Sequence, residues 1–325
     1  MNDNAHTISV IICAYTSDRW NDLCEAVQSV RDQSLRPQEI VLVVDHNPAL
    51  LERARAELPD LVVTENRGSQ GLSGGRNTGV VVARGSILAF LDDDAIADCD
   101  WLARLMAHCR DPYVLGATAK VVPIWIGERP GWFPEEFLWT IGCSYRGLPT
   151  APRQVRNVFG GAMMMKREVF DRIGGFSANL GRQQSGVLLS CEETELCIRA
   201  NIAFPDSCFM IEPSSVVWHK IPASRLNWHY FRRRCYAEGL SKAYIARQMP
   251  AQDLLKTERD YVLAALSRGF GRGLTDFLLH LDTDGLKRAA AIALGVASAG
   301  TGFLVARFQS ARNANEAEAV RRAGV

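Results

Sequence analysis

Residues 84–94 read Arg-Gly-Ser-Ile-Leu-Ala-Phe-Leu-Asp-Asp-Asp, an apolar run that ends in three consecutive carboxylates. The run 87–91 has the length of a buried strand, and such a strand stops where its sheet meets solvent. Open α/β folds place their chemistry at this edge. Asp92 and Asp94 are two residues apart, so in an extended chain they point the same way and can share a hard divalent cation. The alternative is a solvated turn or a helix cap before Trp101.

The sequence before this run alternates between patterns typical of strands and patterns typical of helices. Continuous apolar runs predict further strands, and apolar residues at helical spacing predict the helices between them. Such alternation is typical of a parallel sheet whose strands are joined by right-handed crossovers. We therefore expect an α/β fold. In chain order, the predicted strands and helices cover residues 8–13, 22–31, 39–44, 50–58, 61–64 and 80–84.

Beyond residue 110 the pattern is less regular. Residues 111–160 are rich in proline and aromatic side chains, which is typical of a long functional loop region. Helical spacing predicts helices over 163–170 and 194–200, and residues 215–218 have the pattern of a short strand. After residue 248 the pattern is helical and amphipathic, which predicts a helical extension to the α/β part.

The composition indicates a globular protein without a dominant charge. Of 325 residues, 37 are Lys or Arg and 36 are Asp or Glu, so no global charge favours nucleic acid or an anionic surface. The nine cysteines are scattered and form no CxxC pair, which predicts neither a zinc site nor a disulfide framework. A reduced, cytosolic setting is the simplest interpretation, and the N-terminus lacks the pattern of a signal peptide.

Residues 289–306 are eighteen uncharged residues between Arg288 and Arg307. That length is near the lower limit for a membrane span. The segment consists mostly of Ala and Gly, which insert less favourably than a Leu-rich segment. Three interpretations stay open: a membrane span, an element at the membrane surface or re-entering it, and a buried helix of a soluble protein.

The glycine-rich segment 65–79 follows a short predicted strand. Its glycines do not form GxGxxG, and no Lys-Ser or Lys-Thr follows as a phosphate-binding P-loop requires. Residues 71–75 match the GxSxG pattern of a hydrolase nucleophile, but Ser73 lies nine residues beyond the end of the strand, where that pattern needs a direct strand-to-helix turn. A loop of exposed N–H groups followed by Arg76 favours an anionic phosphate instead.

Other polar groups follow predicted strand ends or begin predicted helices. Asp45 ends the second strand, where an acid accepts hydrogen bonds from a ribose or a base, or simply closes a turn. Gly160 and Gly161 precede an apolar run, which favours close approach of a ligand or a β-bulge. Glu192 and Glu193 begin a predicted helix, where the helix dipole favours acids. Adjacent carboxylates also raise one another's pKa, as a general base requires.

Two further features are cationic or titratable. His219 closes a predicted strand and is either structural or a ligand. Three consecutive arginines at 232–234 have aromatic residues around them. They form either the solvated face of a helix or a phosphate clamp.

These segments stand in the order of a known family. The chain resembles the inverting family 2 glycosyltransferases with the GT-A fold, from residue 7 to residue 245. The stretch 225–243 is similar to nonprocessive members that build cell-surface polysaccharides or glycolipids, and the QxxRW signature of processive synthases is absent. The segments that carry the resemblance are ISVIICAYTSDR, VVDHN, ENRGSQGLSGGRNTGVVVARG, FLDDD, FGGAMMMKREVFDRIGGF, CEETELCIRA and VWH.

The resemblance implies a mixed, mostly parallel sheet flanked by helices, and a role for each matching residue. Asp92 and Asp94 match the DxD motif that holds Mg²⁺ or Mn²⁺ against a diphosphate, and His219 falls where a His can complete the metal or diphosphate site. Asp93 points the other way and is a structural or nucleotide-side contact. The residues implied for the nucleotide sugar are Ala14, Tyr15, Asp45, Asn66, Arg76, Asp92 and Asp93.

The same resemblance places the catalytic base at Glu193, where the family usually has Asp, which leaves Glu192 as the other candidate. Gly160 and Gly161 approach the sugar or the acceptor. For acceptor contact we add Trp132, from the aromatic-rich region 124–159. For the diphosphate we add Arg233 and Arg234.

The implied enzyme moves one sugar from a nucleotide-diphosphate sugar, with UDP the favoured nucleotide, to a hydroxyl of a glycan or polyprenyl-linked acceptor. We expect a catalytic domain over 1–248 and a helical region over 249–325 that docks at the cytoplasmic face of the cell membrane. A sugar-nucleotide pyrophosphorylase is disfavoured because such an enzyme begins with a glycine-rich segment that contains Arg and Lys. This chain has ISVIICAYTSDR in that place. A noncatalytic module that binds sugar nucleotides or glycans is the alternative.

Overall fold

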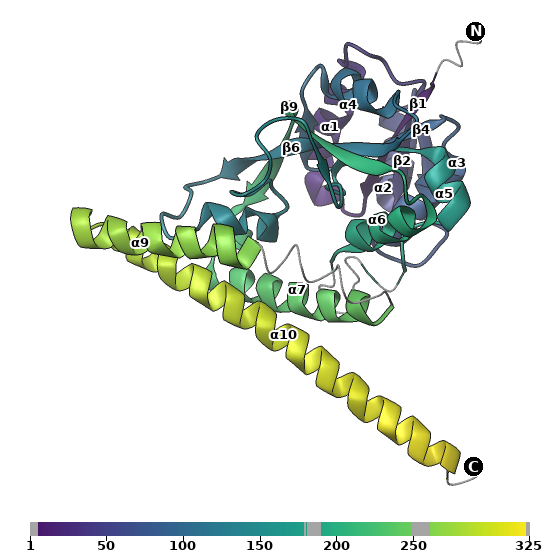
Figure 1. Cartoon of the computed structure of the whole chain (residues 1–325). Helices are drawn as coiled ribbons and strands as arrows, with labels where there is room; N and C mark the ends of the chain where they lie inside the picture. The colour runs from purple at the N-terminus through teal and green to yellow at the C-terminus, as the bar shows by residue number, and fades with distance from the viewer. Residues whose placement is uncertain (1–5, 179, 181–189, 249–260, 323–325) are drawn as a thin grey trace.

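The computed structural model describes residues 6–178, 180, 190–248 and 261–322. A sheet with flanking helices forms its upper part, and the C-terminal helices form a layer beneath (Figure 1). The strands are β1 (Ile8–Ala14), β2 (Glu39–Val44), β3 (Val62–Glu65), β4 (Ile87–Asp92), β5 (Ala95–Ala97), β6 (Val114–Ile126), β7 (Arg153–Val155), β8 (Ala162–Lys166) and β9 (Cys208–Pro222). The helices of the upper part are η1 (Ser17–Arg19), α1 (Trp20–Arg31), α2 (Pro48–Glu57), α3 (Leu72–Val82), α4 (Trp101–Cys109), η2 (Glu135–Ile141), α5 (Arg167–Ile173), α6 (Glu192–Ala203) and η3 (Ala223–Arg225). Those that follow are α7 (Trp228–Gln248), η4 (Val262–Leu266), α9 (Ser267–His280) and α10 (Thr283–Arg322).

The first four predicted strands form the parallel half of the sheet, in the order β3-β2-β1-β4. Ile11 of β1 stands opposite Val41 of β2 and Phe90 of β4. These three side chains pack on one face of the sheet, while Val10 and Ile12 pack in the core on the other. Burial on both faces explains the continuous apolar runs, because a strand covered on one side only would alternate. The expected α/β start of the chain is confirmed.

The other half of the sheet mixes strand directions. β8 is antiparallel to both β4 and β6, β6 is parallel to β9, and β5 and β7 are antiparallel to β9. The predicted helix over 163–170 is therefore wrong in its first part, because residues 162–166 are β8. Met163 and Met164 alternate between the two cores. A short apolar run buried on both sides has no periodicity that separates strand from helix.

Residues 111–160 are not the long loop region that proline suggests, since they contain the 13-residue strand β6. Pro123 lies within β6, opposite His219 of β9. On its other side β6 pairs with β8 only over residues 116–118, so the missing N–H of Pro123 breaks no ladder there. The predicted strand at 215–218 is likewise a part of the 15-residue β9.

The glycine-rich segment is a short loop followed by a helix, and not an extended loop of exposed N–H groups. α3 begins at Leu72, directly after Gly71, whose φ of +119° suits glycine. Gly79 faces β1, and a β-carbon there would overlap the Ile11 side chain. Glycine therefore lets α3 lie close to the sheet and brings its N-terminus to the carboxyl edge.

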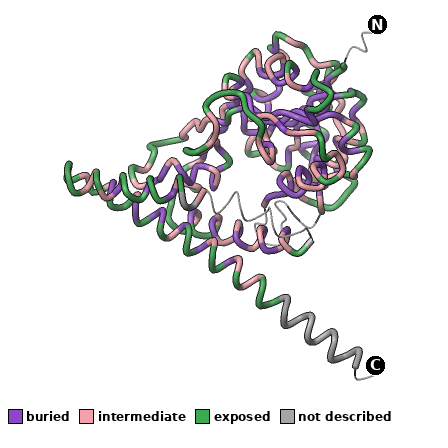
Figure 2. Tube along the Cα trace, viewed as in Figure 1, coloured by how far each residue is buried: buried purple, intermediate pink, exposed green. Residues whose placement is uncertain are grey.

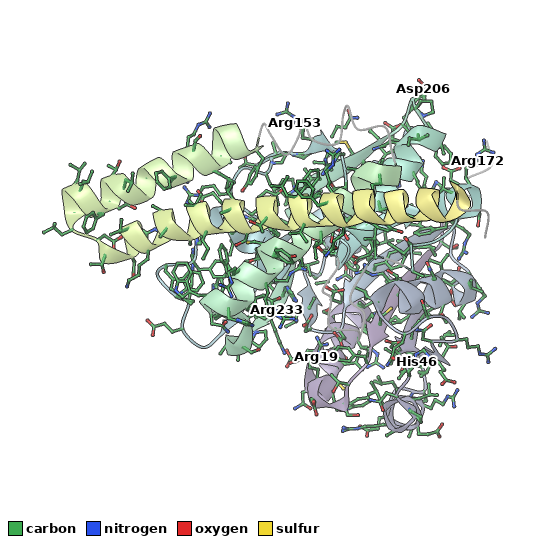
Figure 3. All side chains as sticks on the ribbon, turned by 90° about the horizontal axis from the view of Figure 1, so that it is seen from below. Arg19, His46, Arg153, Arg172, Asp206 and Arg233 are labelled. Atoms are coloured by element: carbon green, nitrogen blue, oxygen red, sulfur yellow. The ribbon has the colours of Figure 1, made fainter. Side chains whose placement is uncertain are left out.

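The C-terminal helices confirm the expected helical extension, and α10 runs across the underside of the molecule (Figure 3). It packs mainly against α7 and α9. Its part from 283 to 309 is long and apolar enough to cross a membrane by length and composition, with mean hydropathy 1.8 and 33% of the most apolar window buried. The remainder of that stretch is partly or fully exposed (Figure 2).

Candidate active site

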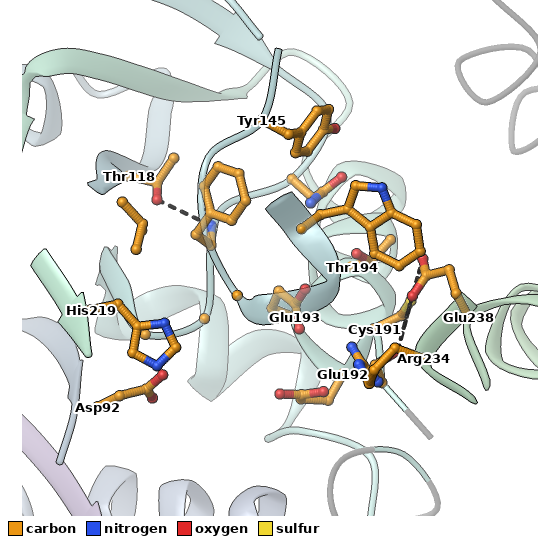
Figure 4. A pocket seen from close by; sticks show the side chains of 18 of the residues that line it. Asp92, Thr118, Tyr145, Cys191, Glu192, Glu193, Thr194, His219, Arg234 and Glu238 are labelled. Atoms are coloured by element: carbon orange, nitrogen blue, oxygen red, sulfur yellow. Dashed lines mark hydrogen bonds between the residues drawn. The ribbon is translucent and has the colours of Figure 1, made fainter. Parts of the chain in front are cut away.

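A cavity of about 1210 Å³ opens at the carboxyl edge of β1, β2 and β4. Figure 4 shows some of the side chains that line it. Its walls come from the ends of these strands, the N-termini of α3 and α6, and the helices α7, η4 and α10. The predicted site residues that border it are Ala14, Tyr15, Asp45, Arg76, Asp92, Asp93, Asp94, Gly160, Gly161, Glu192, Glu193, His219 and Arg234.

The predicted metal ligands lie together. Asp92 ends β4, and Asp94 immediately precedes β5, which pairs with β9 so that Ala95 stands opposite His219. His219 Nε2 lies 3.1 Å from Asp94 Oδ1. One ligand atom from each of Asp92, Asp94 and His219 falls within 4.8 Å of the others. Two carboxylate oxygens and an imidazole nitrogen suit Mn²⁺ well and Mg²⁺ acceptably, so these residues fit a divalent cation.

Arginines compensate the acidic charge at this site. Arg19 Nη1 lies 2.9 Å from Asp93 Oδ1 and 2.6 Å from Asp94 Oδ2, and Arg225 Nη2 lies 3.8 Å from Asp94 Oδ2. Burial alone would raise the pKa of Asp94, but the hydrogen bond and charge of His219, with the charges of both arginines, hold that pKa well below its usual range. Asp94 is therefore an anion at neutral pH.

Arg19 also borders the cavity, although it was not among the residues predicted from the sequence. It is the last residue of ISVIICAYTSDR, the first segment of the family resemblance. Its guanidinium also lies 4.8 Å from the centre of the Tyr15 ring. A cation just after the first strand of such a sheet was the signal that could have revealed it.

Arg76 contacts carboxylates, where the sequence suggested a phosphate. Its side chain is buried, with Nη1 3.0 Å from Glu192 Oε1 and Nη2 3.3 Å from Asp92 Oδ1. Burial alone would lower the pKa of Arg76, but the charges of Glu192 and Asp92 raise it above its usual value. A β-carbon at Gly160 would lie 2.8 Å from Arg76 Nη1, and one at Gly161 would overlap Asp92. The two glycines make room for these side chains. This requirement explains glycine at both positions, in addition to the ligand approach and the β-bulge considered from the sequence.

The two candidates for the catalytic base have different surroundings. Glu192 is buried and paired with Arg76, whereas Glu193 is half-buried at the cavity wall. Among the described residues, Glu193 has no ion-pair partner within 4.0 Å. Burial first, and then the charge of Glu192, raises the pKa of Glu193 to about 8. Glu193 thus titrates within about a unit of neutral pH, the range in which a side chain can both accept and release a proton.

The N-terminus of α6 is held by α7. Cys191 immediately precedes α6 with φ +73°, and its thiol donates a hydrogen bond to Glu238 Oε1 at 3.2 Å. The hydroxyl of Ser190 donates to the other oxygen of Glu238 at 2.9 Å. Glu193 therefore lies beside α7, although α7 comes well after it in the sequence.

Asp45, which follows β2 at the cavity wall, is held by hydrogen bonds. It accepts from Asn66 Nδ2 at 2.6 Å and from the backbone N–H of Gly71 at 2.9 Å. Asn66 is buried and is not part of the cavity wall, and its Oδ1 also accepts from the backbone N–H of Gly68. Asn66 thus orients Asp45 and the loop before α3, and the structure does not bring it into the cavity.

Two other predicted residues are not in the cavity wall. Trp132 stacks on Trp228 with ring centroids 4.1 Å apart, inside an aromatic cluster. Arg233 is exposed on α7, whereas Arg234 borders the cavity and donates to the Thr140 carbonyl. The aromatic side chains of region 124–159 that do border the cavity are Phe137, Trp139, Tyr145 and Phe159.

The hydrolase interpretation of Ser73 has no support in the structure. Ser73 lies in α3 and is buried, and its hydroxyl donates to the Leu180 carbonyl at 2.8 Å. The nine cysteines are free thiols, in agreement with the absence of a predicted disulfide framework.

Comparison with known proteins identifies the family. The sequence matches "Glycosyl transferase family 2" over residues 9–174. The chain belongs to glycosyltransferase family 2. Two curated relatives support this assignment over most of their length. The glucosyl-dolichyl phosphate glucuronosyltransferase of Haloferax volcanii is 32% identical over 239 residues, covering 72% of this chain and 76% of the relative. The succinoglycan biosynthesis protein ExoM of Rhizobium meliloti is 26% identical, covering 73% and 74%.

Solved structures confirm the GT-A fold of this glycosyltransferase. The mannosyltransferase PcManGT from Pyrobaculum calidifontis, solved with GDP-Man and Mn²⁺, has a TM-score of 0.60 at 17% identity, over 93% of this chain and 90% of that one. GalNAc-T7, solved with UDP, GalNAc and Mn²⁺, has a TM-score of 0.52 at 18% identity, over 80% and 54%. At these identities the likeness establishes the fold and leaves the substrate open.

Proposed function

We propose that this enzyme transfers one sugar, with inversion, from a nucleotide-diphosphate sugar to a hydroxyl of a glycan or lipid-linked acceptor, and that it requires Mg²⁺ or Mn²⁺. The observation that carries the proposal is the shared cavity. Asp92, Asp94 and His219 border it together, and the pKa of Glu193 at its wall is raised. Figure 4 shows Asp92 and His219 on one side of the pocket and Glu193 away from them.

The charges in the cavity suit cleavage of a glycosyl–phosphate bond, in which negative charge builds on the leaving diphosphate. When bound by Asp92, Asp94 and His219, a divalent cation would neutralise that charge. Arg19 and Arg234 border the same cavity and can add positive potential. Glu193 removes the proton of the acceptor hydroxyl as its oxygen attacks the anomeric carbon. Attack from the face opposite the leaving group inverts that carbon without a covalent intermediate.

The proposed donor is a UDP-sugar, held at the nucleoside end by Asp45, Ala14 and Tyr15, which border the cavity. UDP and GDP-Man occur in the two similar solved structures, which supports a nucleotide donor and leaves the base open. Thermal shift with UDP and with GDP, each with Mn²⁺, tests this choice. Stabilisation by GDP and not by UDP would refute the proposal of a UDP-sugar donor. It would leave the proposed sugar transfer from a nucleotide-diphosphate sugar in place.

The proposed acceptor is membrane-proximal, in the synthesis of a cell-surface polysaccharide or glycolipid. The relative named for glucosyl-dolichyl phosphate and the apolar stretch of α10 support a polyprenyl-linked acceptor and a peripheral position at the inner face of the cell membrane. We also propose that residues 1–248 form the catalytic domain and 249–325 the helical region. Full-length protein that stays in the soluble fraction without detergent would refute the membrane position.

Two substitutions separate a catalyst from a module that only binds. Glu193→Gln is expected to lower turnover by about 10²–10⁴ while leaving the fold intact. Asp94→Asn is expected to abolish metal-dependent turnover. The measurement is release of nucleotide from a panel of nucleotide sugars, with and without acceptor. A wild-type protein that binds nucleotide sugar with metal and never turns it over would establish the binding module instead.

Glu192→Gln is the matched comparison for Glu193→Gln. Glu192 is buried and paired with Arg76, so its neutralisation removes one partner of a buried ion pair. Loss of one partner from such a pair destabilises a protein by about 3–5 kcal/mol. We expect Glu192→Gln to lower the melting temperature and Glu193→Gln not to lower it. The reverse pattern would exchange the roles of the two residues.

A further inference from the structure

The cavity extends beyond the residues proposed to hold the donor. Its volume of about 1210 Å³ exceeds the roughly 300–1,000 Å³ typical of a pocket for one small ligand. We call the second part of its wall the helical limb. The helical limb is lined by Trp139 and Tyr145 from the upper part, Leu266 from η4, and Val296, Ala299 and Phe303 from α10.

The side chains of the helical limb are apolar or aromatic, unlike those around the metal ligands. A nucleotide or a free sugar needs hydrogen-bond partners along its length, and here only the Trp139 indole N–H and the Tyr145 hydroxyl could supply them. An apolar chain gains free energy by leaving water along such a wall. The helical limb therefore suits a lipid chain and not a second polar substrate.

Cations lie beside the proposed base, where the helical limb meets the donor site. Glu238 of α7 is hydrogen-bonded by Cys191, two residues before Glu193. Arg234 and Lys242 lie one helical turn before and after Glu238, and both border the cavity. Lys242 Nζ lies 3.6 Å from Glu238 Oε1, and against the effect of burial the charges of Lys242 and Arg234 both lower the pKa of that carboxyl group. Guanidinium and ammonium groups at a cavity wall can also pair with a phosphate next to the acceptor hydroxyl.

We propose that the helical limb holds the chain of a polyprenyl-phosphate-linked acceptor, with its phosphate at Arg234 and Lys242 and its sugar hydroxyl at Glu193. This inference rests on the function proposed above and assigns its acceptor to a site. α10 is then a wall of the substrate site, whatever further contact it makes with a membrane.

Two glycines allow a matched test. Gly300 borders the cavity on α10, and a β-carbon there would meet no atom within 4 Å. Gly271 on α9 has equally open space and does not border the cavity. Gly300→Leu and Gly271→Leu add the same volume and the same helix propensity. They differ in whether the new side chain enters the helical limb.

The experiment measures binding of farnesyl phosphate by calorimetry, below its micelle concentration. Wild type and Gly271→Leu are expected to bind it equally, and Gly300→Leu at least tenfold more weakly. Glucose 1-phosphate, which has the phosphate without the chain, is expected to bind at least tenfold more weakly than farnesyl phosphate to wild type. Lys242→Gln is expected to weaken the binding of farnesyl phosphate and to leave the binding of farnesol unchanged. Binding of UDP with Mn²⁺ is expected to be the same in wild type and both glycine variants.

Three outcomes would overturn the inference. They are equal binding of farnesyl phosphate to Gly300→Leu and wild type, equal binding of glucose 1-phosphate and farnesyl phosphate, and no binding of farnesyl phosphate to wild type. If UDP with Mn²⁺ still binds, only the assignment of the helical limb fails and the proposed transferase stands. A wild-type protein that binds no nucleotide with Mn²⁺ contradicts the proposed function and this inference with it.

Discussion

Glu193 carries the acid–base chemistry of the proposed reaction, and its surroundings set the pH at which it can act. Burial and the adjacent Glu192 raise its pKa from 4.5 to about 8. A general base works only when deprotonated, so its effectiveness grows as the pH rises through this value. Arg76 limits the effect because it lies within 3.0 Å of Glu192 and neutralises part of that charge.

We expect kcat/KM of the wild type to rise with pH and to level off above about 8, the pKa of Glu193. Glu193→Gln is expected to give a low and flat profile over the same range. A wild-type profile that is already flat from pH 5 would contradict the raised pKa.

The same raised pKa has a consequence for stability. A carboxyl group whose pKa is higher in the folded than in the unfolded state favours folding when protonated. Its contribution is fully present below 4.5 and is lost as the pH rises toward 8. The free energy of unfolding of wild type relative to Glu193→Gln should therefore fall over this interval. Denaturant titrations at pH 4, 6 and 8 measure it.

Arg19 is the residue whose role follows most directly from distances. Its guanidinium contacts both Asp93 and Asp94, so it neutralises carboxylate charge that would otherwise attract a metal ion. Arg19→Gln is expected to tighten Mn²⁺ binding in the absence of nucleotide by about tenfold, equivalent to about 1.4 kcal/mol. Calorimetry with Mn²⁺ alone measures this. Arg31→Gln, which breaks an exposed pair with Asp60, should leave Mn²⁺ affinity unchanged. Weaker Mn²⁺ binding in Arg19→Gln would contradict this role.

At the scale of secondary-structure elements, two contacts bring the proposed metal ligands together. β5 pairs with β9 and brings His219 to Asp94, while the turn before β8 places Gly161 against Asp92. Neither contact is visible in the sequence, because β5 has only three residues and Gly161 precedes an apolar run. The acids at the end of β4 were predictable, since an apolar strand ending in charge is a local pattern.

Gly161→Ala tests the second contact. A β-carbon at this position would overlap the Asp92 carboxylate, so Asp92 must turn away from the other ligands. We expect Mn²⁺ affinity to fall about 10–100-fold, as for a lost supporting contact of a metal site. Gly271→Ala serves as the control because a β-carbon there meets no atom within 4 Å. Unchanged Mn²⁺ affinity in Gly161→Ala would show that Asp92 is not a ligand.

At the scale of the whole molecule, α7 joins the catalytic part to the C-terminal helices. It packs extensively against α10, although the predicted domain boundary at residue 248 separates the two. Gly239 of α7 faces the Ala299 carbonyl, and Gly302 of α10 faces the Tyr236 carbonyl. Side chains at either glycine would overlap the opposite backbone, so the two helices are in backbone contact there.

Gly302→Leu is expected to lower the free energy of unfolding by about 1–3 kcal/mol, because the added side chain has no room between α7 and α10. Gly300→Leu, two residues away, places the same side chain in open space and should leave that free energy unchanged or raise it. Denaturant titrations of both variants measure the difference. Equal stability of the two variants would mean that α7 and α10 do not pack as closely as in the structure.

Local sequence patterns were enough to predict the α/β class, the acidic edge and most of the candidate site residues that border the cavity. These follow from local patterns, namely apolar runs of strand length, helical spacing between them, and acids directly after strands such as β2 and β4. Two predictions failed because local patterns were not sufficient. The start of the predicted helix 163–170 is the strand β8, and an apolar run buried on both faces has no period that separates strand from helix. Trp132 does not border the cavity, and nothing local in the sequence tells which of several tryptophans will do so.

Tertiary structure alone decided which glutamate is paired and which remains at the cavity wall. Arg76 and Glu192 are 116 residues apart in the sequence, and their contact depends on how α3 and α6 meet the sheet edge. The contact of Arg19 with Asp93 and Asp94, and the approach of α10 to the cavity, are of the same kind. Side-chain charges and surfaces act over a few ångströms, so only the folded chain fixes which of them meet.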